Sequence, residues 1–279
     1  MRSRARRTSR AWICALVATL AAGPVVEGAA RAQDAPFQPE IGQPGKDVVW
    51  VPTPEVLVET MLDLAEVSPV DYVVDLGSGD GRNVIAAARR GARALGVEYN
   101  PEMVTLSRRR AEEAGVADRA QFVEGDMFAA DFSEADVLAL FLLPSNLLRL
   151  RARFLELRPG ARIVSNTFTI QDWAADEVVT LEADCTDWCT AHLYIVPAQV
   201  AGSWRLDGGR LDLVQQFQQV SGTLTREGAS VPVTGSLRGA SISLMAGDQP
   251  FTGQVTGDRI AGSVQDGGRT ASWEATRER

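Results

Sequence analysis

The chain has little cysteine and almost no histidine, with three cysteines and the single His192 among 279 residues. A structural zinc site needs about four ligands, so this composition predicts no metal site. Basic residues form no dense cluster, and the formal net charge is −8. An acidic chain repels a phosphate backbone, so we predict no nucleic-acid partner. An acidic surface suits a cationic substrate instead.

The sequence also lacks an apolar run long enough to cross a bilayer comfortably as a permanent helix. Residues 11–22 are apolar, follow five arginines, and lead through a Gly-Pro pair to an Ala-Arg-Ala triplet that ends at Ala32. This is the layout of a secretory signal. We therefore predict a signal peptide at 1–32 and an exported, periplasmic mature protein. Membrane anchoring is the alternative, which Pro24 and the small-residue exit disfavour.

Cleavage at that point would remove Cys14 and leave Cys185 and Cys189 as the only cysteines. An even pair fits an oxidising compartment. Its spacing can close a small loop if the backbone turns there, so we expect a structural disulfide without a catalytic role. Two buried free thiols are the alternative, because cysteine is readily buried. Loss of the leader would also remove six arginines and one glutamate, which takes the formal charge from −8 to −13.

Apolar periodicity after the leader predicts an α/β domain. Residues 33–47 are rich in Pro, Gly, Gln and acids without an apolar period, and they predict a linker. Helical spacing over 54–65 predicts a helix with Thr53 as its N-cap. From there to residue 168, β-branched apolar runs alternate with helical patterns, which predicts a parallel sheet with helices on both faces.

Two later regions have the pattern of β structure. The stretches 178–183 and 191–197 have no helix between them, and we expect an antiparallel hairpin that completes the sheet. Beyond them, short β-type stretches punctuated by Gly predict a small meander or open barrel for packing or oligomerisation. There, 251–255 and 259–264 flank a Thr-Gly-Asp turn, the pattern of a hairpin. The domain prediction is a signal peptide at 1–32, a linker at 33–47, an α/β domain at 48–198 and an all-β module at 199–279.

A glycine-rich turn joins the first expected strand to a helix and reads Asp75-Leu-Gly77-Ser-Gly79-Asp80-Gly81-Arg82. Glycines can adopt positive φ and let a ligand lie almost against the backbone, because they have no Cβ atom. Arg82 stands where a dinucleotide-binding loop would have its third glycine, so a nucleoside fits better than a pyrophosphate. The turn therefore disfavours a Rossmann-type oxidoreductase.

Two acids follow the next two expected strands. Glu98 ends the second strand, where a carboxylate can accept hydrogen bonds from both hydroxyls of a ribose. Asp126 follows the third strand, where an acid can accept from an adenine amino group while Met127 or Phe128 covers the ring face. The ends of three strands thus converge on one nucleoside, which is the strongest functional signal in the sequence.

From residue 48 to residue 197 the sequence resembles the class I S-adenosylmethionine-dependent methyltransferases. Within that class it resembles the ATP synthase c-subunit lysine methyltransferase group and its bacterial relatives. The resemblance implies a doubly wound, Rossmann-like α/β fold with a seven-stranded sheet. It also implies S-adenosylmethionine as cofactor and methyl transfer to an acceptor, either a protein lysine or a small molecule. The segments that carry the closer resemblance are 51–54, 75–82, 96–98, 142–144 and 157–160.

The resemblance also implies roles for individual residues. It names no catalytic base, because transfer from a sulfonium is an in-line displacement that depends mainly on positioning. After the fifth strand the family has an acidic or His-containing segment, whereas this chain has Ser165-Asn-Thr-Phe168. The implied cofactor-binding residues are Asp75, Gly77, Gly79, Gly81, Glu98, Asp126 and Met127, and the implied substrate-side residues are Val51, Pro52, Thr53, Pro54, Leu143 and Pro144.

An alternative function follows from the predicted export. S-adenosylmethionine is made in the cytoplasm, so an exported enzyme would need a periplasmic supply or a cofactor loaded before export. The alternative is therefore an exported module that binds a nucleoside or a partner and transfers no methyl group.

Overall fold

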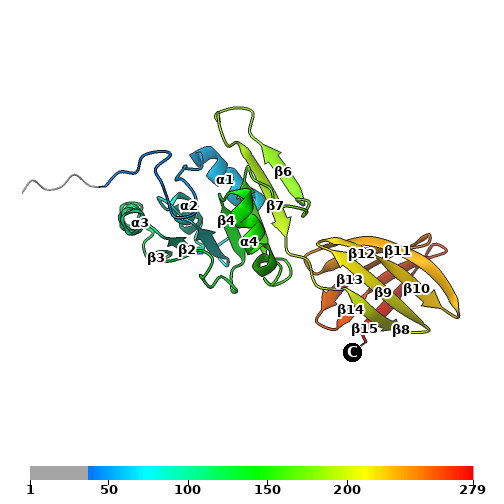
Figure 1. Cartoon of the computed structure of the whole chain (residues 1–279). Helices are drawn as coiled ribbons and strands as arrows, with labels where there is room; N and C mark the ends of the chain where they lie inside the picture. The colour runs from blue at the N-terminus through cyan, green and yellow to red at the C-terminus, as the bar shows by residue number, and fades with distance from the viewer. Residues whose placement is uncertain (1–36, 279) are drawn as a thin grey trace, which may run out of the picture. The chain divides into compact units, whose positions relative to one another are not determined.

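The structure is a computed structural model that describes residues 37–278 (Figure 1). The predicted signal peptide at 1–32 lies outside these residues, as does the beginning of the predicted linker. The described chain forms an α/β domain followed by an antiparallel β-barrel. Within this range no helix combines the length and the apolar character that a membrane span requires.

Seven strands form the sheet of the α/β domain, in the spatial order β3-β2-β1-β4-β5-β7-β6. The first five strands of that order are parallel, and β7 and β6 complete the sheet as the predicted antiparallel pair. The strand order reverses between β1 and β4, where open α/β sheets bind their ligands. The strands are β1 Tyr72–Leu76, β2 Arg93–Glu98, β3 Ala120–Glu124, β4 Val137–Leu140, β5 Arg162–Asn166, β6 Glu177–Thr180 and β7 Thr190–Ile195.

Helices cover both faces of this sheet, as the doubly wound prediction requires. Residues of α1, α2 and α3 pack with Val73 of β1 in one apolar cluster, and residues of α4 pack with Val74 in another. Successive side chains of a strand point to opposite faces, so the two clusters lie on either side of the sheet. The helices are α1 Glu55–Leu64, α2 Arg82–Arg89, α3 Pro101–Glu113 and α4 Pro144–Phe154.

The start of α1 corrects one prediction. The N-cap of α1 is Pro54, and no side chain caps the helix, so the expected capping role of Thr53 is wrong. Thr53 is buried instead, and its hydroxyl accepts a hydrogen bond from Asn166 Nδ2 at 3.3 Å. The Thr53 hydroxyl thus bonds to Asn166 at the end of β5 and not to the backbone N–H groups that begin α1.

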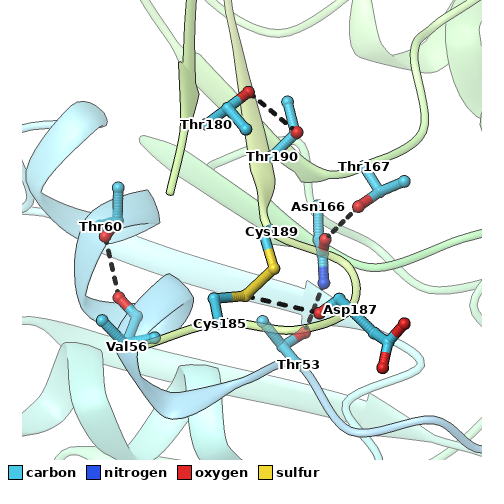
Figure 2. Close-up of a disulfide and its surroundings, with 10 residues drawn as sticks. All are labelled: Thr53, Val56, Thr60, Asn166, Thr167, Thr180, Cys185, Asp187, Cys189 and Thr190. Atoms are coloured by element: carbon cyan, nitrogen blue, oxygen red, sulfur yellow. Dashed lines mark hydrogen bonds between the residues drawn. A yellow bond between two sulfur atoms is a disulfide. The ribbon is translucent and has the colours of Figure 1, made fainter. Parts of the chain in front are cut away.

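The connection between β6 and β7 contains the predicted disulfide, Cys185–Cys189, with the two Cα atoms 5.8 Å apart. Figure 2 shows this disulfide and its surroundings, which include Thr53 and Asn166. The expectation of a bonded pair is confirmed, and the alternative of two buried free thiols is wrong. The disulfide closes a short loop that contains Trp188, and we call residues 185–189 the disulfide loop.

The C-terminal module is a meander of eight antiparallel strands that closes into a barrel, so the expected meander is confirmed and the alternative of an open barrel is wrong. The last strand pairs with the first, with Ala275 opposite Leu206, and this long-range pairing has no local sequence signal. The predicted hairpin is confirmed as β13 and β14. The strands are β8 Gly202–Leu206, β9 Gly209–Gln216, β10 Gln219–Arg226, β11 Ala229–Arg238, β12 Ser241–Ala246, β13 Gln249–Thr256, β14 Arg259–Asp266 and β15 Arg269–Arg277.

The barrel interior is filled by its own apolar side chains, which include the fully buried Trp204. At the turn between β9 and β10, the Phe217 ring stacks on Trp173 with centroids 5.4 Å apart, and Gln218 Nε2 donates to the carbonyl of Ala174 at 2.7 Å. A packed interior and contacts of this kind agree with a packing role for the barrel, which stays a prediction.

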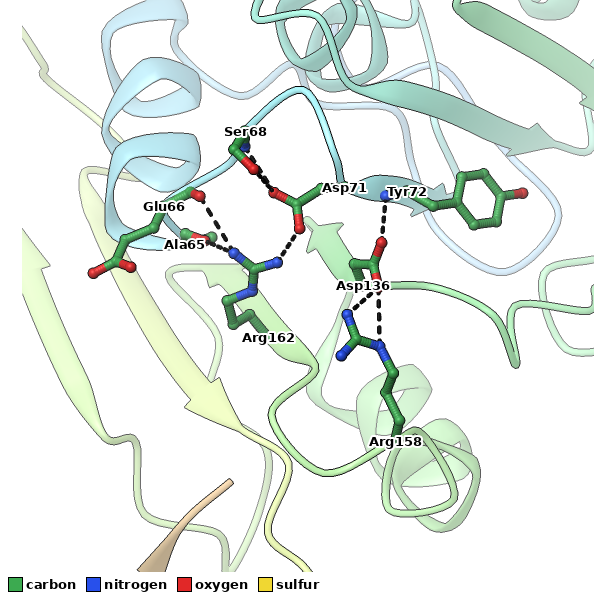
Figure 3. A network of polar contacts seen from close by, with 8 residues as sticks. All are labelled: Ala65, Glu66, Ser68, Asp71, Tyr72, Asp136, Arg158 and Arg162. Carbon is green, nitrogen blue, oxygen red and sulfur yellow. Dashed lines mark hydrogen bonds and ion pairs between the residues drawn. The ribbon is translucent and has the colours of Figure 1, made fainter. Parts of the chain in front are cut away.

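A polar network fixes the amino ends of β1, β4 and β5 (Figure 3). The Asp71 carboxylate accepts from the Ser68 backbone N–H at 2.7 Å and pairs with Arg162. Asp136 accepts from the Tyr72 backbone N–H at 2.7 Å and from Arg158 Nε at 2.9 Å. These charged contacts lie at the amino edge of the sheet, which leaves the carboxyl edge for the functional site.

Candidate functional site

A cavity lies at the carboxyl edge of the sheet, where the strand order reverses. Its walls come from the residues that follow β1, β2, β3 and β4, and from a segment of the chain that precedes α1. We call this segment, residues 43–51, the N-terminal cover. Part of the predicted linker therefore contributes to the site, which its polar composition did not indicate.

The glycine-rich turn follows β1 with Gly77, Gly79 and Gly81 all at positive φ, as predicted. Gly77 lines the cavity. A Cβ atom added to Gly79 would lie 2.7 Å from Trp50 Nε1, so this glycine lets the N-terminal cover pack on the turn. A Cβ atom at Gly81 would lie 2.8 Å from the Phe122 ring, so Gly81 allows the packing of helix on strand.

Glu98 lies at the end of β2 and lines the cavity. Its Oε2 accepts from the backbone N–H of Gly79 at 2.9 Å, and its Oε1 accepts from that of Asn100 at 2.9 Å. Each carboxylate oxygen has a second lone pair. The two backbone donors therefore fix the orientation of Glu98 and leave it able to accept from the hydroxyls of a ribose.

Asp126 lines the same cavity after β3, beside Met127. Asp126 Oδ2 accepts from Lys46 Nζ at 2.7 Å, and Oδ1 accepts from the Phe128 backbone N–H at 2.9 Å. The hydrogen bond from Lys46 is the largest cause that holds the pKa of Asp126 below its usual value. Lys46 belongs to the N-terminal cover and is the only lysine of the chain, a signal that sequence reasoning missed.

Asp75 lies deeper, at the end of β1, and lines a small second cavity with Gly79 and Thr53. Burial raises the pKa of Asp75 to about 8, against a hydrogen bond that Asn83 Nδ2 donates at 3.0 Å. A cationic group bound next to this carboxyl would lower its pKa again. Asp75 is thus a buried carboxyl group that can lose its proton when a cation binds beside it.

The predicted substrate-side residues divide into two sets. Val51 lines both cavities, Leu143 lines the main one, and Pro52 lines the small one with Thr53. Pro54 is the N-cap of α1 and Pro144 is the first residue of α4, and neither lines a cavity described here. The two prolines therefore set where helices begin near the site.

Three aromatic residues that the sequence reasoning did not select complete the main cavity: Phe141, Phe168 and Trp188. We call them the aromatic wall. Phe141 and Phe168 have ring centroids 6.1 Å apart and are stacked, and the Trp188 ring lies 5.7 Å from each of them. Phe141 follows β4, Phe168 follows β5, and Trp188 lies in the disulfide loop before β7.

Comparisons with known proteins agree with this geometry. Residues 75–177 match the model of the ANTKMT methyltransferase domain. The chain is 42% identical over 152 residues to a protein-lysine N-methyltransferase of Saccharolobus islandicus, covering 53% of this chain and 94% of that protein. It is 40% identical over 117 residues to the human ATP synthase c-subunit lysine N-methyltransferase, and this match covers 42% of this chain and 50% of that protein.

A solved structure gives the same fold with a different acceptor in its description. It is an RNA methyltransferase of Salinibacter ruber in complex with S-adenosylhomocysteine, with 47% identity and a TM-score of 0.51, and the match covers 54% of this chain and 96% of that one. Fold and site together define an S-adenosylmethionine-dependent methyltransferase. The chain belongs to the methyltransferase family that includes the Saccharolobus enzyme.

S-adenosylmethionine is the cofactor of this class, and the described residues fit it. Gly77 has no side chain, and the space into which its Cβ atom would point is open except for Leu142, at 3.4 Å. The cofactor would pass the turn through this space. Glu98 presents fixed carboxylate oxygens for the ribose, and Asp126 presents acceptors near Met127 for the adenine. These individual roles remain predictions that binding measurements can test.

Proposed function

We propose that this enzyme transfers the methyl group of S-adenosylmethionine to a lysine side chain of another protein. The observation that carries the proposal is the match to the Saccharolobus protein-lysine N-methyltransferase, which spans 94% of that protein. The aromatic wall supports it, because an apolar wall suits the alkyl stem of a lysine. Lys46, the one lysine of the chain, is bound to Asp126, which favours an acceptor lysine on a second molecule.

The chemistry asks the protein mainly for positioning. When bound, S-adenosylmethionine supplies an activated methyl group, and the acceptor nitrogen must reach it in line. Gly77 leaves room beside the turn, while Glu98 and Asp126 hold the nucleoside. A lysine amine has an ordinary pKa of about 10.4 and must lose its proton before it attacks.

RNA is the second candidate acceptor, because the Salinibacter relative is described as an RNA methyltransferase. Charge argues against it in this chain. The formal net charge is −8, and the one cation that lines the described cavity, Lys46, is paired with Asp126. Arg149, which stands over the Phe128 ring, has Asp47 4.0 Å away. A phosphate backbone would therefore meet few unpaired cations near this site.

We also propose that the enzyme acts in the periplasm after export. The leader-like composition of residues 1–32 supports this location, and so does a disulfide, which persists in oxidising compartments. Amino-terminal sequencing of protein recovered from the periplasm tests the location. A new terminus at Gln33 is the expected result, and recovery of uncleaved protein from the cytoplasm would contradict it.

The decisive test of the acceptor is transfer of labelled methyl from S-adenosylmethionine to lysine-containing peptides, with the same peptides carrying Arg for Lys, and to RNA. The enzyme carries Lys46→Arg, so that it has no lysine of its own to accept label. We expect label on the lysine peptides alone. Label on RNA alone would replace the proposal, and cofactor binding without any transfer would favour the exported binding module.

A further inference from the structure

The order of strands in the sheet separates the two ends of the cavity. Asp126 follows β3, Glu98 ends β2, Gly77 follows β1, and Phe141 follows β4, so these residues are placed along the carboxyl edge in that order. Phe168 follows β5, the next strand of the edge. A nucleoside held by Asp126 and Glu98 therefore directs the rest of the cofactor toward the aromatic wall.

The aromatic wall depends on the disulfide loop for its third member. Trp188 precedes Cys189 and has a φ of 60°, a left-handed conformation that a bulky side chain rarely adopts. Asp184, just before Cys185, also has positive φ, at 61°. Such conformations persist where the surrounding structure holds them, and the disulfide joins the two ends of this loop. The side chain of Trp188 is 40% exposed although its ring contacts Phe141 and Phe168.

An exposed indole at the rim of a cavity has a definite chemistry. The faces of aromatic rings attract alkylammonium groups, and Trp does so best. The alkyl stem of a lysine also packs well on aromatic carbon. A more apolar acceptor could use the same rings, but it would gain nothing from the acidic charge of this chain, which attracts cations.

We propose that Trp188, presented by the disulfide loop, determines acceptor specificity by holding the lysine side chain against Phe141 and Phe168. This inference rests on the proposed lysine methylation and adds the residue that selects the acceptor. Trp188 is a positioning residue for the acceptor and takes no part in proton or methyl transfer. It acts on acceptor binding and leaves the cofactor end, with Glu98 and Asp126, unchanged.

The test measures steady-state kinetics with a lysine peptide that the wild-type full chain methylates, together with calorimetric binding of S-adenosylmethionine. We expect Trp188→Ala to raise the peptide KM about five- to thirtyfold, with kcat within about threefold. Trp188→Phe should restore most of the loss, because it keeps a ring. The affinity for S-adenosylmethionine should stay within about twofold in both variants. An unchanged KM in Trp188→Ala would overturn the inference, and so would an equal loss of cofactor affinity.

Two further variants separate the loop from the ring. The double variant Cys185→Ser, Cys189→Ser keeps Trp188 but opens the loop, and its peptide KM should rise in the same direction. A KM equal to that of the wild type would show that the disulfide does not position Trp188 and would overturn that part of the inference. Val178→Ala is the matched control, since Val178 lies exposed in the same hairpin and does not line the cavity. It should leave KM unchanged.

The same data distinguish two kinds of failure. If the wild-type enzyme methylates no lysine peptide, the proposed function fails, whatever Trp188 does. If the wild type methylates the peptide and Trp188→Ala does so with the same KM, the proposed function stands and only the inference about Trp188 fails.

Discussion

At the cofactor end of the cavity, the backbone N–H groups of Gly79 and Asn100 hold Glu98, whereas at the other end Phe141, Phe168 and Trp188 hold one another. The first end is built on residues that directly follow strands, so each position is tied to the sheet. The second end is built from side-chain packing between three separate segments. The cofactor end of this chain thus rests mainly on positions that the sheet sets, whereas the aromatic wall depends on how distant segments meet.

The largest effect should come from the cofactor end. Glu98→Ala removes both carboxylate acceptors, and charge-assisted hydrogen bonds are roughly twice as strong as neutral ones. We expect the affinity for S-adenosylmethionine to fall about 10- to 100-fold by calorimetric titration. The peptide KM, measured at saturating cofactor, should change little. An unchanged cofactor affinity would move the nucleoside site elsewhere and break the comparison.

A smaller and opposite pattern should come from the aromatic end. Phe168→Ala removes one ring of the aromatic wall, and an aromatic pair contributes about 0.5–1.5 kcal/mol beyond its buried area. We expect the peptide KM to rise about fivefold while cofactor affinity stays within about twofold. If Phe168→Ala weakens cofactor binding more than peptide binding, the two ends are not separate in the way the strand order indicates.

Asp75 lies between the two ends and gives a pH prediction. Its pKa is about 8 in the folded protein, above the ordinary value of 3.8. The folded state then binds the proton more tightly, so the free energy of unfolding falls as pH rises from about 4 to about 8 and levels off above that. Asp75→Asn removes this contribution and keeps an oxygen for Asn83.

The measurement is the Tm of the ligand-free protein and of Asp75→Asn between pH 5 and pH 9. We expect the wild-type Tm to fall relative to the variant by roughly 10 °C across this range, because about three pKa units at about 1.4 kcal/mol each amount to about 4 kcal/mol. Parallel curves for the two proteins would show that Asp75 does not carry the raised pKa.

The smallest effect should come from Lys46→Arg. Arginine keeps a positive charge near Asp126, so the ion pair can form again and cofactor affinity should stay within about threefold. Lys46→Met is the informative contrast, because it releases Asp126 from its cation and removes the hydrogen bond that lowers its pKa. Equal cofactor affinities for wild type, Lys46→Arg and Lys46→Met would show that the N-terminal cover does not act through Lys46.

The sequence predicted the parts of the site that have a local pattern. The alternation of strands and helices predicted the doubly wound sheet, and the turn at Gly77 and the acid at Glu98 could be placed because each follows an apolar strand. Gly81 was assigned to the cofactor, which stays a prediction, and its missing Cβ atom also makes room for Phe122. Thr53 was assigned to a helix cap, but its hydroxyl accepts from Asn166. Both contacts join residues far apart in the sequence.

The rest of the site had no local signal to find. Lys46 lies in a segment whose Pro, Gly and Gln content indicates a linker, and only the folded chain brings it to Asp126. Trp188 could be noticed between two cysteines, but nothing in the sequence shows that it meets Phe141 and Phe168. Barrel closure is a similar case, since it pairs the first strand of the module with the last.

By itself, the sequence located the glycine turn and the two acids beside the ends of β2 and β3, and its resemblance to a known family implied the class and the cofactor. The turn and the acids could be located because a strand followed by a glycine turn or an acid is a short pattern that fixes position through the backbone. The tertiary structure alone decided the aromatic wall, the N-terminal cover and the closed barrel. These depend on packing and strand pairing between distant segments, which no spacing along the chain records.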